Sequence, residues 1–282
     1  MSRIALRRLV PLAATLGLVP TATMPVFAQD ALDKIKAKGV VEMGVAAEPP
    51  YSDLKADGTL TGADPDVARA VFAELGDIKL NANVVDWGAL IPGLMANRFD
   101  AVATGLFIRP ERCQAVAFSQ PVLCTAEGMI VRKGKPKGIT SYEALAKSDA
   151  IIAVVAGAEQ KRALDLGTPP ERIMEVPDVF VAVDLLKSGR VDVLGFPDVT
   201  LIEVMKNLPA DQYELLSPLE GEPIQCSAAA FNPQNKAMRD FYDAGLKKLK
   251  ASGKFKEILT AYGFDPALPD KITRTELCGA EN

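Results

Sequence analysis

The chain has 282 residues with 32 Lys and Arg against 36 Asp and Glu, and it contains no histidine. Without an imidazole, a Ser-His-Asp triad and the common His-containing catalytic zinc sites are excluded, and with no C-x-x-C pair among the four cysteines we expect neither a metal nor a cofactor. The acidic balance gives no electrostatic reason to bind nucleic acid or an anionic membrane surface.

Residues 1–28 have the features of a cleaved secretory signal peptide. They carry three arginines and no acidic side chain, contain an apolar run at 9–19, and end in Ala28, a small residue of the kind that signal peptidase prefers. The run is too short to be a transmembrane helix. Because no cysteine lies near the cleavage point, we expect a periplasmic protein without a lipid anchor.

The first part of the mature chain alternates strand and helix patterns. Strand, helix, strand, helix and strand patterns follow one another at 40–45, 64–75, 80–85, 89–99 and 101–103. Asp64 is the expected N-cap of the first of these helices, with Pro65 at its first helical position. This order predicts a mostly parallel sheet covered by helices on both faces.

The alternation begins again after Pro136. Residues 150–155 form a continuous apolar run that is typical of a central parallel strand. Further helix and strand patterns follow at 157–166, 172–176, 179–187, 191–194 and 198–208. The chain therefore contains two α/β units of similar size, and extended stretches at 122–131 and 223–231 flank the second unit. Two amphipathic helices are expected near the end, at 236–252 and 254–262.

A set of motifs occurs in an order known from one protein family. The motifs are Glu48-Pro49-Pro50-Tyr51, Gly62-Ala63-Asp64-Pro65-Asp66-Val67-Ala68, the segment 87–94 and the segment 104–112. Together they resemble the polar amino acid type of extracellular solute-binding proteins, family 3, over essentially the whole mature chain. The resemblance implies a non-enzymatic binding protein that delivers a small ligand to the permease subunits of an ABC importer in the inner membrane.

The resemblance also implies the fold, an α/β periplasmic-binding-protein architecture of type II. Two lobes are joined by two crossover strands, and the ligand lies in the cleft between them. Lobe 1 would comprise residues 29–122 and 228–282, lobe 2 residues 127–222, and the hinge strands residues 123–126 and 223–227. We expect the protein to be a monomer.

Within this family, the residues are most similar to the ectoine- and hydroxyectoine-binding group. The similarity rests on Glu48 before Pro-Pro-Tyr, Asp64-Pro65, Phe107, Cys113 directly after Arg112, and the tail ending in Leu277-Cys278. It implies a small zwitterion as ligand, with one carboxylate and one delocalised cation.

The resemblance assigns the ligand carboxylate to Arg112. A guanidinium offers two parallel donors to a carboxylate, and backbone N–H groups near Gly105 and Phe107 would complete the anion site. The alternative is a helix-end arginine that pairs with Glu111 or with solvent.

Glu48 and three aromatic rings are the candidates for binding the cation. Glu48 lies beside two prolines at the end of a strand, where open α/β sheets bind ligands. The rings of Tyr51, Trp87 and Phe107 would add cation–π attraction of about 0.5–2 kcal/mol each. The alternatives are an exposed loop glutamate and ordinary core packing of the rings.

The second unit differs from family members that bind α-amino acids. Those proteins carry an aspartate after this strand to hold the α-ammonium, whereas this chain has Pro197 there and Asp198 one residue later. The difference favours a delocalised cation over a primary ammonium. Phe196 is a further candidate ring, and Asp198 is a candidate anion displaced by one residue. Gln160 and the N–H groups of its helix start are candidate ligand contacts. The alternative for that helix start is a tight strand-to-helix turn without a ligand.

Four cysteines in an exported chain allow three disulfide pairings. The register of the resemblance places Cys124 and Cys226 on the two crossover strands and so implies that they pair, leaving Cys113 with Cys278. A local bond between Cys113 and Cys124 is the competing arrangement.

Two other functions remain open from the sequence. One is binding of a polar amino acid such as glutamine, or of an opine-like derivative. The other is a cyclohexadienyl dehydratase-like enzyme on the same fold, in which Glu48 would serve as acid or base. Because no histidine titrates near neutral pH, we expect ligand binding to be nearly independent of pH between 6 and 8.

Overall fold

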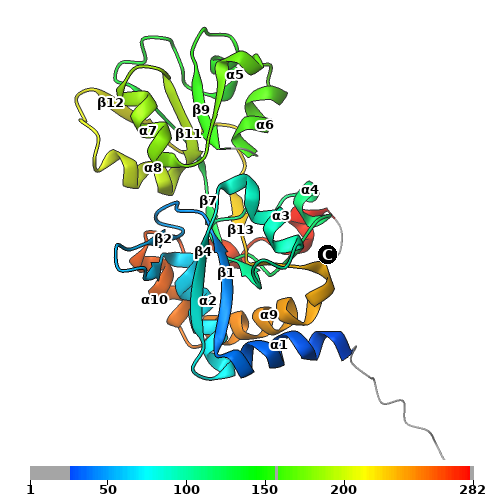
Figure 1. Ribbon diagram of the computed structural model, residues 1–282. Helices are drawn as coiled ribbons and strands as arrows, with labels where there is room; N and C mark the ends of the chain where they lie inside the picture. The colour runs from blue at the N-terminus through cyan, green and yellow to red at the C-terminus, as the bar shows by residue number, and fades with distance from the viewer. Residues whose placement is uncertain (1–25, 156–157, 280–282) are drawn as a thin grey trace, which may run out of the picture.

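The computed structural model describes residues 26–155 and 158–279 (Figure 1). Most of the predicted signal peptide therefore lies outside the described residues, and helix α1 (Val26–Lys38) begins two residues before the expected cleavage point. Within the described part of the chain, no helix is long and apolar enough to cross a membrane.

The first sheet has five strands in the order β4-β1-β5-β14-β6. Their bounds are β4 Lys79–Val84, β1 Val40–Val45, β5 Ala101–Val102, β14 Ala230–Phe231 and β6 Ala117–Phe118. Strand β1 is parallel to β4 and β5, whereas β14 is antiparallel to β5 and β6. A segment from late in the chain thus completes a sheet built from its first part.

The second sheet also has five strands, in the order β10-β9-β11-β8-β12. Their bounds are β10 Ile173–Val176, β9 Ile152–Val155, β11 Val193–Pro197, β8 Glu127–Arg132 and β12 Tyr213–Leu216. Strand β9 is parallel to β10 and β11, and β8 is antiparallel to β11 and β12. In each sheet three neighbouring strands are parallel, as expected: β4, β1 and β5 in the first, and β10, β9 and β11 in the second. One strand of each sheet, β14 or β8, runs antiparallel to both of its neighbours.

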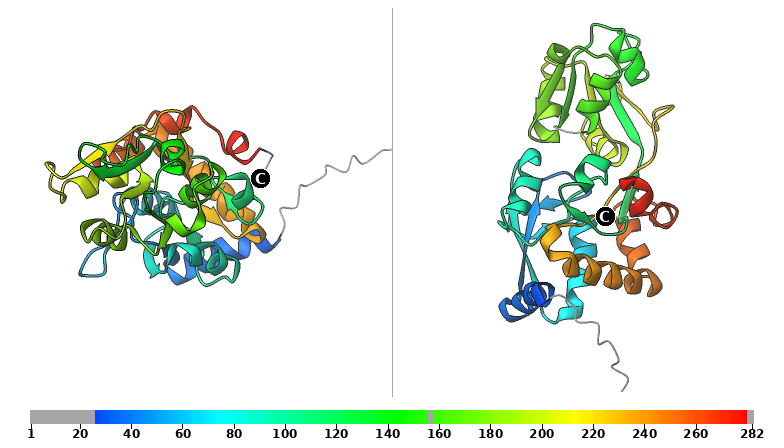
Figure 2. Two further views of the ribbon diagram at one scale, coloured as in Figure 1. Left: turned by 90° about the horizontal axis from the view of Figure 1, so that it is seen from above. Right: turned by 90° about the vertical axis from the view of Figure 1, so that its right-hand side faces the viewer.

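Two short antiparallel strands, β7 (Leu123–Thr125) and β13 (Gln225–Ser227), run between the two sheets. Figure 1 and the right-hand view of Figure 2 show one α/β body above the other, and Figure 1 shows these strands between them. Two five-stranded sheets with two connecting strands are the architecture predicted for the type II fold.

The helices pack on the sheets through their apolar sides. Around the first sheet these are α1, α2 (Ala63–Phe72), α3 (Leu90–Met95), α4 (Pro110–Cys113), α9 (Lys236–Ala251), α10 (Lys254–Ala261) and α11 (Arg274–Cys278). Around the second sheet these are α5 (Tyr142–Ala146), α6 (Ala158–Asp165), α7 (Val179–Lys187) and α8 (Asp198–Met205). A small hairpin, β2 (Asp53–Leu54) with β3 (Leu60–Thr61), projects after β1 and was not expected from the sequence.

Several expected helix boundaries differ from the structure, and two of the differences have a clear physical reason. The helix expected at 89–99 ends at Met95, and Asn97 takes a left-handed backbone with a φ of 54° that stops it. The cap of α2 is Gly62 and not Asp64, which lies inside the first turn. A side chain at Gly62 would place its Cβ 2.5 Å from the carbonyl oxygen of Tyr51, so this position requires glycine.

Both disulfides that the resemblance implied are present. Cys124 on β7 bonds Cys226 on β13, and Cys113 on α4 bonds Cys278 on α11. The first bond joins the two strands that run between the sheets. The second ties the end of the chain to the helix that carries Arg112.

Replacing Cys124 and Cys226 together by serine is expected to lower the free energy of unfolding. Loop closure over a separation of 102 residues gives up to about 4–5 kcal/mol at 25 °C. Denaturant unfolding of the oxidised protein and of the double variant measures the difference, and peptide mapping without reductant checks the pairing. An unchanged unfolding midpoint in the double variant would contradict the expectation.

Candidate functional site

A narrow cavity, with room for about one water molecule, lies between the two sheets. Its lining residues are Glu48, Trp87, Gly105, Phe107, Arg112, Val155, Glu159 and Pro197. Most of them follow the carboxyl end of a strand, on β1, β4 and β5 in the first sheet and on β9 and β11 in the second. This edge of a parallel sheet is where open α/β folds bind ligands.

Glu48 is buried in the wall that follows β1, with 6% of its surface exposed. Its loop is closed on itself, because the Glu48 and Ser52 backbones exchange hydrogen bonds of 2.9 and 3.2 Å. From the second sheet's body, the Thr200 hydroxyl on α8 donates to Glu48 Oε1 at 3.1 Å. Glu48 therefore lies where the two bodies meet, and it is not an exposed loop residue.

The pKa of Glu48 is raised to about 8, first by burial and then by the neighbouring carboxylate of Glu159, while the Thr200 hydrogen bond opposes the change. At neutral pH the Glu48 carboxyl therefore holds its proton. The expectation that binding is independent of pH from 6 to 8 no longer follows, since a group at the cavity titrates within this range.

Arg112 is supplied by α4, a single turn that begins with Pro110. Its guanidinium Nη1 donates to the Phe107 carbonyl oxygen at 3.0 Å, which fixes the side chain against the cavity wall. Burial lowers the pKa of Arg112 to about 10, with a further contribution from Arg109, so the group is still a cation at neutral pH. It is available to bind a carboxylate in the cavity.

Two of the three predicted rings line the cavity. Trp87 and Phe107 do so, whereas Tyr51 is 1% exposed and packs behind them, with its ring 6.2 Å from Phe107 and 5.0 Å from Phe264 in edge contacts. Tyr51 therefore supports the Phe107 ring from the core and does not belong to the lining.

The strand β11 presents Pro197, not Phe196, to the cavity. Successive side chains on a strand point to opposite faces, and Phe196 is fully buried in the core of the second sheet. The Asp198 carboxylate accepts hydrogen bonds from Thr125 and from Ser217, the latter at 3.0 Å. It thus attaches α8 to β7 and does not line the cavity.

At the start of α6, the cavity is lined by Glu159 and not by the predicted Gln160. The amide of Gln160 donates to Glu175 at 2.8 Å on the outer side, whereas Glu159 is 4% exposed. Residues 156–157, whose N–H groups were expected to contact the ligand, lie outside the described residues. The sequence predicted a helix start here, but the side chain that faces the cavity is that of Glu159, one residue before the predicted Gln160.

Gly105 lines the cavity, but its N–H is turned away from it. The group donates to Asp64 Oδ2 at 2.5 Å, so it is not free to complete the anion site that was expected there. Its φ is 82°, and a Cβ at this position would lie 2.8 Å from Cγ of Tyr51. Both facts require glycine.

The cavity thus combines one guanidinium, two buried carboxyl groups and two aromatic rings. Such a set can bind a carboxylate at one end and a cation at the other. Among the residues that the structure describes, no three Asp, Glu, Cys or His side chains lie together as a metal site.

The chain is similar to known proteins over most of its length. The profile for bacterial extracellular solute-binding proteins, family 3, matches residues 41–265. A probable amino-acid ABC transporter periplasmic-binding protein from Sinorhizobium fredii is 36% identical, over 96% of this chain and 93% of its own. The glutamine-binding protein of Bacillus subtilis is 28% identical, over 82% of this chain and 83% of its own.

Solved structures give the same result. The crystal structure of EhuB in complex with hydroxyectoine is 41% identical with a TM-score of 0.86, covering 90% of this chain and all of that one. An ancestral amino acid-binding protein, a precursor of cyclohexadienyl dehydratase, is 25% identical with a TM-score of 0.72, covering 82% and 98%. The chain therefore belongs to family 3 of the bacterial extracellular solute-binding proteins.

Proposed function

We propose that the protein is the periplasmic substrate-binding component of an ABC importer and that it binds a small zwitterion of the ectoine and 5-hydroxyectoine type. The observation that carries this proposal is the lining of the cavity, in which Arg112 lies together with Glu48, Glu159 and two rings. The similarity to EhuB, whose structure contains hydroxyectoine, supports it.

The two ends of such a ligand match the two ends of the cavity. Arg112 would donate two parallel hydrogen bonds to the ligand carboxylate. Glu48 and Glu159 would share the positive charge, which in ectoine is spread over the two nitrogens of its ring amidinium. Trp87 and Phe107 would face the ring of the ligand, where cation–π attraction is strongest for a delocalised, poorly hydrated cation.

The proposed lobes are residues 29–122 with 228–282, and 127–222, joined at 123–126 and 223–227. Glu48 follows a strand of the first lobe and Thr200 belongs to the second, so their hydrogen bond joins the two lobes across the cleft, which we propose closes on the ligand. Affinity in the low micromolar range or tighter is expected for paired charges buried with several hydrogen bonds.

A polar amino acid is the second candidate ligand, and Glu159 is the observation in its favour. The second lobe has no aspartate at the position of Pro197, yet Glu159 supplies a buried carboxylate from the same lobe. An α-ammonium could be held there. Glutamine and arginine therefore belong in any binding assay, as does an opine.

An enzyme of the dehydratase type is the third candidate, because a buried glutamate with a raised pKa can act as a proton donor. Incubation with prephenate or arogenate tests it. Formation of phenylpyruvate or phenylalanine, lost in Glu48→Gln, would replace the binding-protein proposal.

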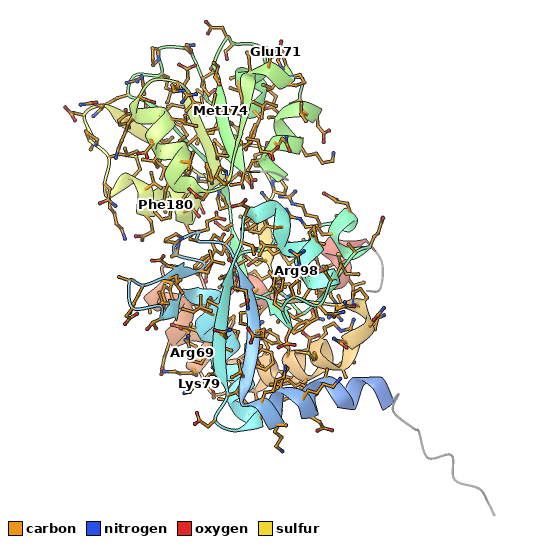
Figure 3. All side chains as sticks on the ribbon, in the orientation of Figure 1. Arg69, Lys79, Arg98, Glu171, Met174 and Phe180 are labelled. Atoms are coloured by element: carbon orange, nitrogen blue, oxygen red, sulfur yellow. A yellow bond between two sulfur atoms is a disulfide. The ribbon has the colours of Figure 1, made fainter. Side chains whose placement is uncertain are left out.

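Arg112→Met is expected to weaken ectoine binding at least about 100-fold, because it leaves the ligand carboxylate buried without a partner. Arg112→Lys should weaken it about tenfold, since an ammonium cannot reproduce the two-donor fork. Titration calorimetry measures both. The control is Arg98→Met at an exposed arginine (Figure 3), which should leave the affinity unchanged. Equal affinities of Arg112→Met and wild type would contradict the assignment.

Ectoine affinity is expected to rise between pH 6 and pH 8, by up to about tenfold per pH unit. With the two lobes in contact, as in the structure, Glu48 holds its proton up to a pKa of about 8, and binding a cation there requires the carboxylate, so binding releases this proton. Glu48→Gln should bind more weakly and without this pH dependence. Wild-type affinity that is equal at pH 6 and pH 8 would contradict a cation bound at Glu48.

The stability of the ligand-free protein should change in the opposite direction. A carboxyl whose pKa is raised on folding makes the native state bind more protons than the unfolded state, so stability falls as pH rises from about 5 to 8. Glu48→Gln should remove part of this fall and melt at a higher temperature than wild type at pH 8. Thermal melts of both proteins at pH 5 and pH 8 measure the difference, and parallel curves would contradict it.

A further inference from the structure

Behind the cavity, buried polar groups connect the loops that carry its lining residues. The Ser52 hydroxyl lies 2.6 Å from the Ala46 carbonyl oxygen and 2.5 Å from the Thr104 hydroxyl. The Thr104 hydroxyl also accepts from the Ala46 N–H at 3.1 Å. The loop of Glu48 and the segment 104–107 are thus held as one unit, although they are far apart in the sequence.

Asp64 reaches this unit from the first turn of α2. Its side chain is 1% exposed, and Oδ2 accepts from the Gly105 N–H at 2.5 Å. Its own N–H donates to the Tyr51 carbonyl oxygen at 3.1 Å. The positive end of the α2 helix dipole favours a carboxylate at this position.

The surroundings of Asp64 give little else to compensate its burial. In the part of the chain that the structure describes, Oδ1 has no hydrogen-bond partner, and the same holds for the hydroxyls of Tyr51 and Tyr242. A buried carboxyl with so few partners costs stability. The hydrogen bond that offsets part of this cost is the one from the Gly105 N–H, in a segment that lines the cavity, to Asp64 Oδ2.

The effect of that bond extends to Arg112 through a short path. Gly105 is held by the hydrogen bond to Asp64 and by close packing of its Cα against the Tyr51 ring. Two residues later, the ring of Phe107 lines the cavity, and its carbonyl oxygen accepts the bond from Arg112. A shift of Gly105 would therefore move both the ring and the acceptor that orients the guanidinium.

We infer that Asp64 is a positioning residue for ligand binding: it holds the segment 105–107 in the conformation that presents Phe107 and orients Arg112. The consequence for affinity rests on the proposed function, whereas the consequence for the segment does not. Burial raises the pKa of Asp64 to about 7, and the Gly105 hydrogen bond opposes the rise. The protonated form still has a carbonyl oxygen that can accept, so asparagine is a close mimic of it.

Hydrogen exchange of the ligand-free protein tests the inference at Gly105. Asp64→Ala should speed exchange of the Gly105 amide at least tenfold, and Asp64→Asn should stay within about threefold of wild type. Asp66→Asn is the matched control, because Asp66 lies in the same helix turn but accepts from the Tyr262 hydroxyl at 2.6 Å; it should leave Gly105 unchanged.

The inference is overturned if Asp64→Ala leaves the Gly105 amide protected, or if asparagine fails to restore the protection that alanine removes. Should the alanine variant not fold, Asp64→Leu replaces it, with the same expected increase in exchange rate. Leucine fills the space of the carboxyl group but cannot accept a hydrogen bond.

Calorimetry with ectoine tests the consequence for binding. The affinity should fall at least tenfold in Asp64→Ala, stay within threefold in Asp64→Asn, and stay unchanged in Asp66→Asn. Full affinity in an alanine variant whose Gly105 amide exchanges fast would overturn the positioning role. A wild-type protein that binds no ectoine overturns the proposed ligand instead, and the exchange experiment then still decides the role of Asp64 in holding the segment.

Discussion

The gathering of three ionisable side chains around one small cavity is the constraint on which the rest of the structure depends. Glu48 and Glu159 are buried and Arg112 is half-buried, and removing charge from water is costly unless it is paired. The proposed zwitterion would pair with these groups, its carboxylate with the guanidinium and its cation with the two acids. The raised pKa of Glu48 has the same cause, which is the burial of its carboxyl group.

The fold meets this constraint by bringing strand ends together. Each charged or aromatic lining residue follows a strand in one of two sheets, so the cavity forms where the carboxyl edges of the sheets face each other. The Cys124–Cys226 bond and the Asp198 contacts to Thr125 and Ser217 hold the chain segments that run between the sheets. An acid displaced by one residue from the family pattern has thus become part of this connection.

Much of the site could be predicted from sequence because its residues stand in motifs. Glu48 and Arg112 lie in segments whose order identifies the family, and both line the cavity. The errors have a common cause, which is side-chain direction. The alternation of side chains along a strand could have predicted that Phe196 and Pro197 point to opposite faces, one into the core and the other toward the cavity. The choice between Gln160 and Glu159 depends on helix rotation, and the contact of Asp64 with Gly105 joins residues 41 positions apart, so neither could be derived from local pattern.

The most direct measurement is a crystal structure of the protein with ectoine. The account predicts the ligand carboxylate on the Arg112 guanidinium, the ring amidinium between Glu48 and Glu159, and the ring of the ligand against Trp87 and Phe107. A ligand bound elsewhere, or an ectoine whose carboxylate points toward Glu48, would contradict it.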